Sequence, residues 1–122
     1  METAFAYRRL SQGEEKESQG ILDTQLNDMK EFSRKHNILI LKDYNEGIHT
    51  GDEYRETFNK MIQDAIIIKP NYIIVREQSR LSRDAALTIQ TVKDLEASGT
   101  KVLSVIEGNL TKDITLTSFK AV

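Results

Sequence analysis

The feature that most constrains this chain is a regular alternation of short apolar segments with longer amphipathic ones. Strand-like segments lie at residues 3–10, 38–41, 72–75 and 101–106. Apolar residues recur at helical spacing between them, at residues 18–35, 52–65 and 83–98. A β-α-β-α-β-α-β order predicts an α/β fold, because strands joined through helices pair in parallel with right-handed crossovers. We therefore predict a three-layer domain whose mostly parallel sheet of four or five strands is flanked by helices.

Local signals refine the boundaries of these elements. The aliphatic run at residues 38–41 reads as a buried strand, and residues 11–20, which hold no aliphatic side chain, read as a polar loop. Ser82 is the expected N-cap of the third helix, and Gly99 follows its end. Arg55 is expected in the first turn of the second helix.

Composition excludes several classes of site. The chain has no cysteine, which removes disulfides, zinc ribbons and thiol catalysis. There is no Walker motif or GxGxxG sequence, and the two histidines are far apart, so neither a nucleotide cradle nor a metal site is predicted. No apolar run approaches the ~20 residues of a membrane span. We expect a cytoplasmic protein without membrane contact.

The arginines are clustered although the net charge is -2. Six of the seven lie in four short segments: Arg8, Arg9, Arg55, Arg76, Arg80 and Arg83. The polar segments 9–11, 46–51 and 76–83 each follow a predicted strand, and sites in parallel sheets form at the carboxyl ends of the strands. A local anion site on a mildly acidic protein is therefore expected.

The segment that ends the first strand offers a candidate nucleophile. Alternate residues of a strand share a face, so Tyr7, Arg9 and Ser11 point together, whereas Arg8 points away and is expected to be a surface charge. A guanidinium suits phosphate because its planar fork donates paired hydrogen bonds and stays charged. The residues alone leave open a serine that attacks a phosphodiester and a non-catalytic phosphate-binding or protein-interaction module.

One polar residue lies on an apolar helix face. Gln25 shares the stripe that also holds Ile21 and Met29. A buried amide without partners is costly. Gln25 is therefore expected either to bond the backbone or to support the site.

Together these motifs resemble the catalytic domain of the serine recombinases, the family of resolvases, invertases and the large phage and transposon integrases. Tyr7, Arg9 and Ser11 match the family's Tyr-x-Arg-x-Ser run, and Arg80 and Arg83 match its Asp-Arg-Leu-x-Arg run. The remaining family positions are filled by Gln25, Glu46, Thr50, Gly51 and Arg55. The resemblance spans residues 4–108, and the long gap from Ser11 to Gln25 is more similar to the large serine recombinases.

The resemblance implies a mechanism. Ser11 would attack a DNA phosphate to form a 5′-phosphoserine link, with Arg9, Arg80 and Arg83 holding the phosphate and Arg55 supporting. Strand exchange and religation would need neither a metal nor ATP, so no cofactor is expected. The partners implied are DNA and further copies of the chain, as a homodimer and then a synaptic tetramer of the full-length protein.

Three family positions differ in this chain. Glu46 replaces an aspartate and Thr50 replaces a serine, and both changes keep the chemistry. Ser79 stands where the family has an aspartate before the first arginine, so that acid role is either lost or supplied by Glu77 or Asp84.

The resemblance also predicts the extent of the domain. Residues 1–108 would be the catalytic domain of a bacterial, phage or mobile-element protein. Residues 109–122 would be the truncated start of the connecting and oligomerisation helix. Because the synapsis helix and a DNA-binding region would follow, we expect residues 1–122 alone to be inactive in complete recombination.

Overall fold

The computed structural model describes residues 1–47 and 55–112, which build a five-stranded sheet in the order β2-β1-β3-β4-β5. The four parallel strands are β1 (Glu2–Arg8), β2 (Ile38–Asn45), β3 (Tyr72–Val75) and β4 (Lys101–Ser104). The last strand, β5 (Gly108–Asn109), pairs antiparallel with β4. The predicted α/β class and mostly parallel sheet are confirmed.

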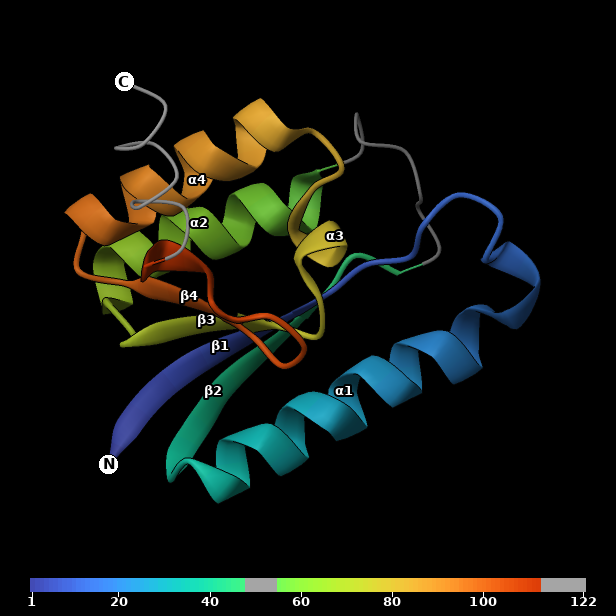
Figure 1. The fold of residues 1–122 in the computed structure, drawn as a ribbon, viewed down its shortest axis with the longest axis horizontal. Helices are drawn as coiled ribbons and strands as arrows, with labels where there is room; N and C mark the ends of the chain where they lie inside the picture. The colour runs from blue at the N-terminus through green and yellow to red at the C-terminus, as the bar shows by residue number, and fades with distance from the viewer. Residues whose placement is uncertain (48–54, 113–122) are drawn as a thin grey trace.

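Helices cover both faces of this sheet (Figure 1). α1 (Ser18–Lys35) lies on one face, and α2 (Glu56–Ile68) and α4 (Ala85–Ala97) lie on the other. Two single turns, η1 (Glu15–Glu17) and α3 (Gln78–Leu81), precede α1 and α4. The layers follow from the periodicity, because each long helix has one apolar stripe that must be buried.

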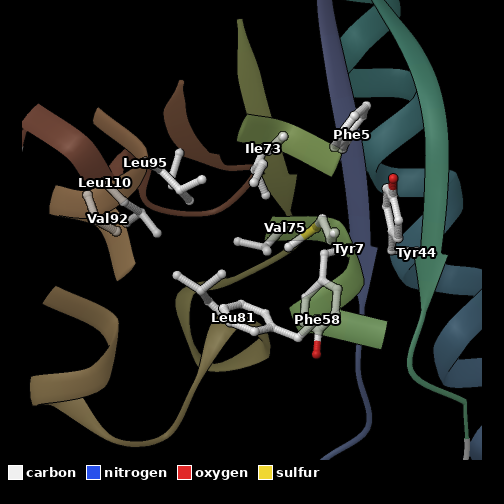
Figure 2. Close-up of a cluster of buried hydrophobic side chains, with 13 residues drawn as sticks. Phe5, Tyr7, Tyr44, Phe58, Ile73, Val75, Leu81, Val92, Leu95 and Leu110 are labelled. Atoms are coloured by element: carbon white, nitrogen blue, oxygen red, sulfur yellow. The ribbon is translucent and has the colours of Figure 1, made fainter. Parts of the chain in front are cut away.

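The interior strand β1, which lies between β2 and β3, is buried on both faces. Its alternate residues separate by size: Ala4 and Ala6 belong to the cluster under α1, and Phe5 and Tyr7 belong to the cluster under α2 and α4. Figure 2 shows the second cluster, in which Tyr7 meets Phe58 of α2 with ring centroids 5.5 Å apart. The larger core therefore ends at the carboxyl edge of the sheet, next to the residue that follows β1.

β2 differs from the buried strand expected at residues 38–41. It continues to Asn45 and forms one edge of the sheet, and Leu39 and Leu41 are 49% and 43% exposed. A register shift opposite Ala4 and Phe5 changes the phase of the strand near Leu41. An aliphatic run does not distinguish an edge strand from a central one, so the expectation of full burial was wrong.

The start of α4 also differs from the prediction. Asp84 is the N-cap, since its carboxylate accepts a hydrogen bond from the Leu87 amide at 3.1 Å. The Ser82 hydroxyl instead accepts one from the Asp84 amide at 3.0 Å. Both residue types cap helices well, and the turn of α3 moves the start of α4 two residues along the chain. In α2, Arg55 precedes the first turn rather than lying in it.

Arg8 is not the surface charge that the strand alternation predicts. Its guanidinium is buried and makes a two-point ion pair with Asp43 of β2, and Nη1 donates to the Leu22 carbonyl at 3.3 Å. The second face of β1 is covered by α1, and Asp43 pairs in register with Ala6. Arg8 therefore joins α1 to the edge of the sheet.

Candidate active site

Ser11 and Arg80 meet at the carboxyl edge of the sheet. Ser11 follows the end of β1, and Arg80 lies on α3, which follows β3. Nη1 of Arg80 donates to the Ser11 hydroxyl oxygen and to the Arg9 carbonyl, each at 3.2 Å. The guanidinium thus holds the serine hydroxyl from one side and the end of its strand from the other.

A carboxylate that none of the sequence motifs indicates shares this corner. Glu14 accepts hydrogen bonds from Nη1 and Nη2 of Arg80 at 2.6 and 3.2 Å, and another from the backbone amide of Ser11. The Arg80 hydrogen bond is the main reason that the pKa of Glu14 lies below its ordinary value. The sequence signal for this contact is the position of Glu14, three residues after Ser11. In the structure these residues form a turn in which the Glu14 amide donates to the Ser11 carbonyl at 3.2 Å.

Arg9 is completely buried and lies beneath the corner. Its Nε donates to the Arg80 carbonyl at 3.1 Å, and its Nη2 donates to the Ser79 carbonyl at 2.7 Å. Gln25 of α1 closes the same network, because its side-chain amide bonds both the amide and the carbonyl of Arg9, at 3.2 and 2.9 Å. Gln25 thus bonds the backbone at the point where β1 enters the site.

Of the two acids considered as substitutes at position 79, only Glu77 contacts Arg80. Its Oε1 accepts from Nε of Arg80 and from Nη1 of Arg76, each at 3.2 Å. Asp84 caps α4 instead. Ser79 is exposed and supplies its carbonyl to Arg9. A carboxylate therefore does orient Arg80, although it comes from two residues earlier in the chain.

A second group of predicted residues gathers at the start of α2. The Tyr7 hydroxyl donates to Glu46 at 2.6 Å, and the same carboxylate accepts from the amides of Thr57 and Phe58 at 3.0 and 3.1 Å. Burial is the main cause that raises the pKa of Tyr7 far above its ordinary value, and the Glu46 hydrogen bond adds to it. Tyr7 is therefore a neutral donor that fixes Glu46.

Arg55 stands beside this group, packed against the ring of Phe58. Its guanidinium carbon lies 3.7 Å from the centre of the Phe58 ring, which gives a cation–π contact. Within the described residues, its Nη1 and Nη2 are buried and have no hydrogen-bond partner. An unpaired buried donor is costly, so this position favours an incoming anion.

Two predicted site residues stand apart from these networks. Arg83 is exposed between α3 and α4. Its side chain makes no hydrogen bond to another residue of the described ranges, 1–47 and 55–112. Thr50 and Gly51 lie outside the described residues, as does the end of the predicted connecting region, 113–122. Over the same described ranges, no group of three or more histidines and acids is placed to hold a metal ion.

A pocket of about 560 Å³ opens beside the serine–arginine corner. Its lining includes Glu14, Gln25, Arg76, Glu77 and Arg80. Through this pocket, solvent and any anionic group carried by a larger ligand can approach the guanidinium of Arg80.

The described helices include none that is both long enough and apolar enough to traverse a bilayer.

Comparisons with known proteins give one consistent result. The family model described as "Resolvase, N terminal domain" matches residues 4–120. A resolvase family site-specific recombinase from Streptococcus pneumoniae is similar in structure, with a TM-score of 0.83 and 25% identity over 99% of this chain and 86% of that one. Among curated protein sequences, no relative matches.

Two further solved structures are similar in fold. The N-terminal catalytic domain of TP901-1 integrase has a TM-score of 0.78 and 21% identity, over 98% of this chain and 92% of that one. The C-terminal catalytic domain of ISC1926 TnpA, an IS607-like serine recombinase, has a TM-score of 0.71 and 15% identity, over 98% and 79%. At these identities the likeness concerns the arrangement of the chain.

Proposed function

Because the chain belongs to the resolvase family, whose N-terminal domain model covers residues 4–120, we propose that Ser11 is the nucleophile of a site-specific DNA recombinase. The observation that carries the proposal is the 3.2 Å hydrogen bond from Arg80 to the Ser11 hydroxyl at the carboxyl edge of the sheet. A hydroxyl beside a fixed guanidinium is the pairing that attack on a phosphodiester needs.

The proposed reaction exchanges one phosphoester bond for another. The Ser11 oxygen forms a bond to phosphorus, the bond from phosphorus to the 3′ oxygen breaks, and that oxygen leaves as a 3′-hydroxyl with a proton. The DNA 5′ phosphate stays on Ser11. Religation runs the same step in reverse, after strands have been exchanged between subunits. The phosphoester energy is retained throughout, so the step uses no ATP, and in this proposal arginines take the charge-neutralising role that a metal ion would otherwise have.

The arginines receive different roles in this proposal. Arg80 neutralises charge on the non-bridging oxygens in the transition state, since its Nη1 already donates to the hydroxyl. Arg9 acts as a positioning residue through the carbonyls of Ser79 and Arg80. Arg55 supplies Nη1 and Nη2, which have no hydrogen-bond partner among the described residues, as donors for a DNA phosphate. Arg83 and Thr50 are proposed as further phosphate contacts made when DNA binds.

The test uses the full-length protein and a DNA substrate nicked so that the cut strand cannot be religated. Wild-type protein should become covalently linked to DNA, and Ser11→Ala should form no adduct. Ser18→Ala, a nearby serine change at the start of α1, is the matched control and should react normally. An adduct that persists in Ser11→Ala would rule out this nucleophile. DNA binding by the wild type without any adduct would support the non-catalytic phosphate-binding module instead.

The substrate and the assembly of the protein are part of the same proposal. DNA is the substrate, and a homodimer followed by a synaptic tetramer is the expected assembly of the full-length protein. Residues 1–122 alone are expected to complete no strand exchange. Recombinant product formed by that chain alone would contradict this part.

A further inference from the structure

The Glu14 carboxylate takes the donors that a phosphate would need at Ser11. Nη1 of Arg80 donates both to the Ser11 hydroxyl and to Glu14 Oε1, so one nitrogen faces the nucleophile and the carboxylate together. Nη2 of Arg80 bonds the other carboxylate oxygen at 3.2 Å. The Ser11 amide completes a set of three N–H groups that converge on one anion.

A carboxylate and a phosphodiester compete for such a set. Each presents two anionic oxygens in one plane to the guanidinium fork, which is the geometry of paired hydrogen bonding. The remaining faces of Arg80 are engaged, because Nε bonds Glu77 and Nη1 also bonds the Arg9 carbonyl. Arg80 therefore cannot turn to offer the same fork elsewhere, and the two anions exclude each other.

The attachment of Glu14 is one that can be exchanged. Its side chain is 24% exposed, and within the described residues its side-chain hydrogen bonds go to Ser11 and Arg80. Gly13, with a φ of +92°, forms the turn that brings Glu14 back toward Ser11. Rotation of the Glu14 side chain frees the three donors and leaves the Arg9 and Gln25 network in place.

We propose that Glu14 is the resident occupant of the phosphate subsite formed by Ser11 and Arg80, and that a DNA phosphate binds there only by displacing it. The inference rests on the proposed function for its account of which anion enters. The apparent affinity for phosphate is then the intrinsic affinity multiplied by the fraction of time that Glu14 is away from the site. In the absence of DNA, the bound Glu14 keeps the serine hydroxyl blocked.

The test measures inorganic phosphate binding to the 122-residue chain by NMR, following the backbone amide of Ser11. Glu14→Gln should bind phosphate about tenfold more tightly than wild type. If Glu14 fills the site about nine-tenths of the time, the site is open about one-tenth of the time, and the apparent affinity of wild type is lowered about tenfold. Glu17→Gln removes the same charge from an exposed position three residues along and should change the affinity far less. Glu14→Asp, whose shorter side chain reaches the fork less well, should fall between wild type and Glu14→Gln.

Each outcome decides the inference separately from the nucleophile. Equal affinities for Glu14→Gln and Glu17→Gln would overturn it, as would phosphate binding that leaves the Ser11 amide unmoved or no binding in any variant. A well-dispersed spectrum of Glu14→Gln shows that this variant is folded. If Glu14→Gln does not fold, the phosphate affinity of Glu14→Asp is compared with that of wild type instead. Tighter phosphate binding in Glu14→Gln with no DNA adduct in wild type would keep the inference and end only the proposed covalent chemistry.

Discussion

Three arginines that match the family motifs differ in what their guanidinium groups contact. Arg80 holds the Ser11 hydroxyl, Arg9 is buried against two carbonyls, and Arg83 is exposed. The difference matters for mutagenesis, because loss of Arg9 disturbs the backbone that carries Arg80, whereas loss of Arg80 removes the charge itself. Glu77 belongs to the same network, since it is the acid on the Nε side of Arg80.

Replacing Glu77 should slow the reaction without removing the nucleophile. In Glu77→Gln the adduct should form about 10- to 100-fold more slowly, because Arg80 loses its fixed orientation at the phosphate. The fall should appear in the rate at saturating DNA more than in DNA affinity. Adding Ser79→Asp, which returns a carboxylate next to Arg80 in the chain, should recover part of the rate. Glu31→Gln, exposed on α1, is the control, and an unchanged rate in Glu77→Gln would refute the positioning role.

Two carboxylates, Glu46 and Asp64, join the edge strand β2 to the helix α2. Glu46, one residue after β2, holds the start of α2 and the Tyr7 hydroxyl. Farther along α2, Asp64 accepts from the Tyr44 hydroxyl at 2.6 Å and pairs with Lys60 at 3.0 Å and Lys42 at 3.6 Å. Both carboxylates join β2 to α2, so the edge strand depends on charges as well as on its single strand partner.

Loss of the Glu46 charge should loosen the start of α2. Glu46→Gln should lower the free energy of unfolding by about 1.5–3 kcal/mol, since three donors share the buried carboxylate and an amide group cannot accept from all of them equally. Urea unfolding measures the change. Glu96→Gln, exposed on α4, is the control and should lie within about 0.5 kcal/mol of wild type. Equal stabilities of the two variants would contradict the capping role.

The Asp64 contacts should make stability depend on pH in the acid range. The Tyr44 hydrogen bond is the main cause that lowers the pKa of Asp64, followed by the bond from Lys60. A lowered pKa contributes stability above the unfolded-state pKa of about 3.9, and that contribution is lost as the pH falls through the folded-state value. Wild type should therefore exceed Asp64→Asn in urea midpoint at pH 7, and the gap should close in acid. A gap that stays constant down to the acid limit would count against this account.

For the molecule as a whole, helical periodicity and strand composition were sufficient to predict the fold class. The bounds of α1 and β3 match the expected segments, since each has a clear pattern and an unambiguous end. α3 was missed because four residues are too few to show a period. The burial of Arg8 and the Glu14–Arg80 pair depend on packing between segments far apart in the chain, which no local pattern reports. The gathering of Ser11 and Arg80 was predictable from the rule that strand ends share one edge.

The core on the α2 and α4 face should account for much of the stability of the sheet. Leu95 is 2% exposed and belongs to that core, whereas Leu87 on the same helix is 39% exposed. Leu95→Ala should lower the free energy of unfolding by about 2–5 kcal/mol through lost burial and the cavity left behind. Leu87→Ala should change it by about 0.5 kcal/mol or less. Similar losses in the two variants would show that the assigned core is wrong.

The most direct test of the central claim is to identify the residue that carries DNA after cleavage. Full-length protein trapped on a nicked substrate is digested with nuclease and trypsin, and the phosphorylated peptide is sequenced by mass spectrometry. We predict a phosphoryl group on Ser11, within the tryptic peptide of residues 10–16, and a free 3′-hydroxyl on the cleaved strand. A phosphoryl group on Ser18, Tyr7 or any other residue, or a DNA 3′ phosphate joined to the protein, would contradict the account.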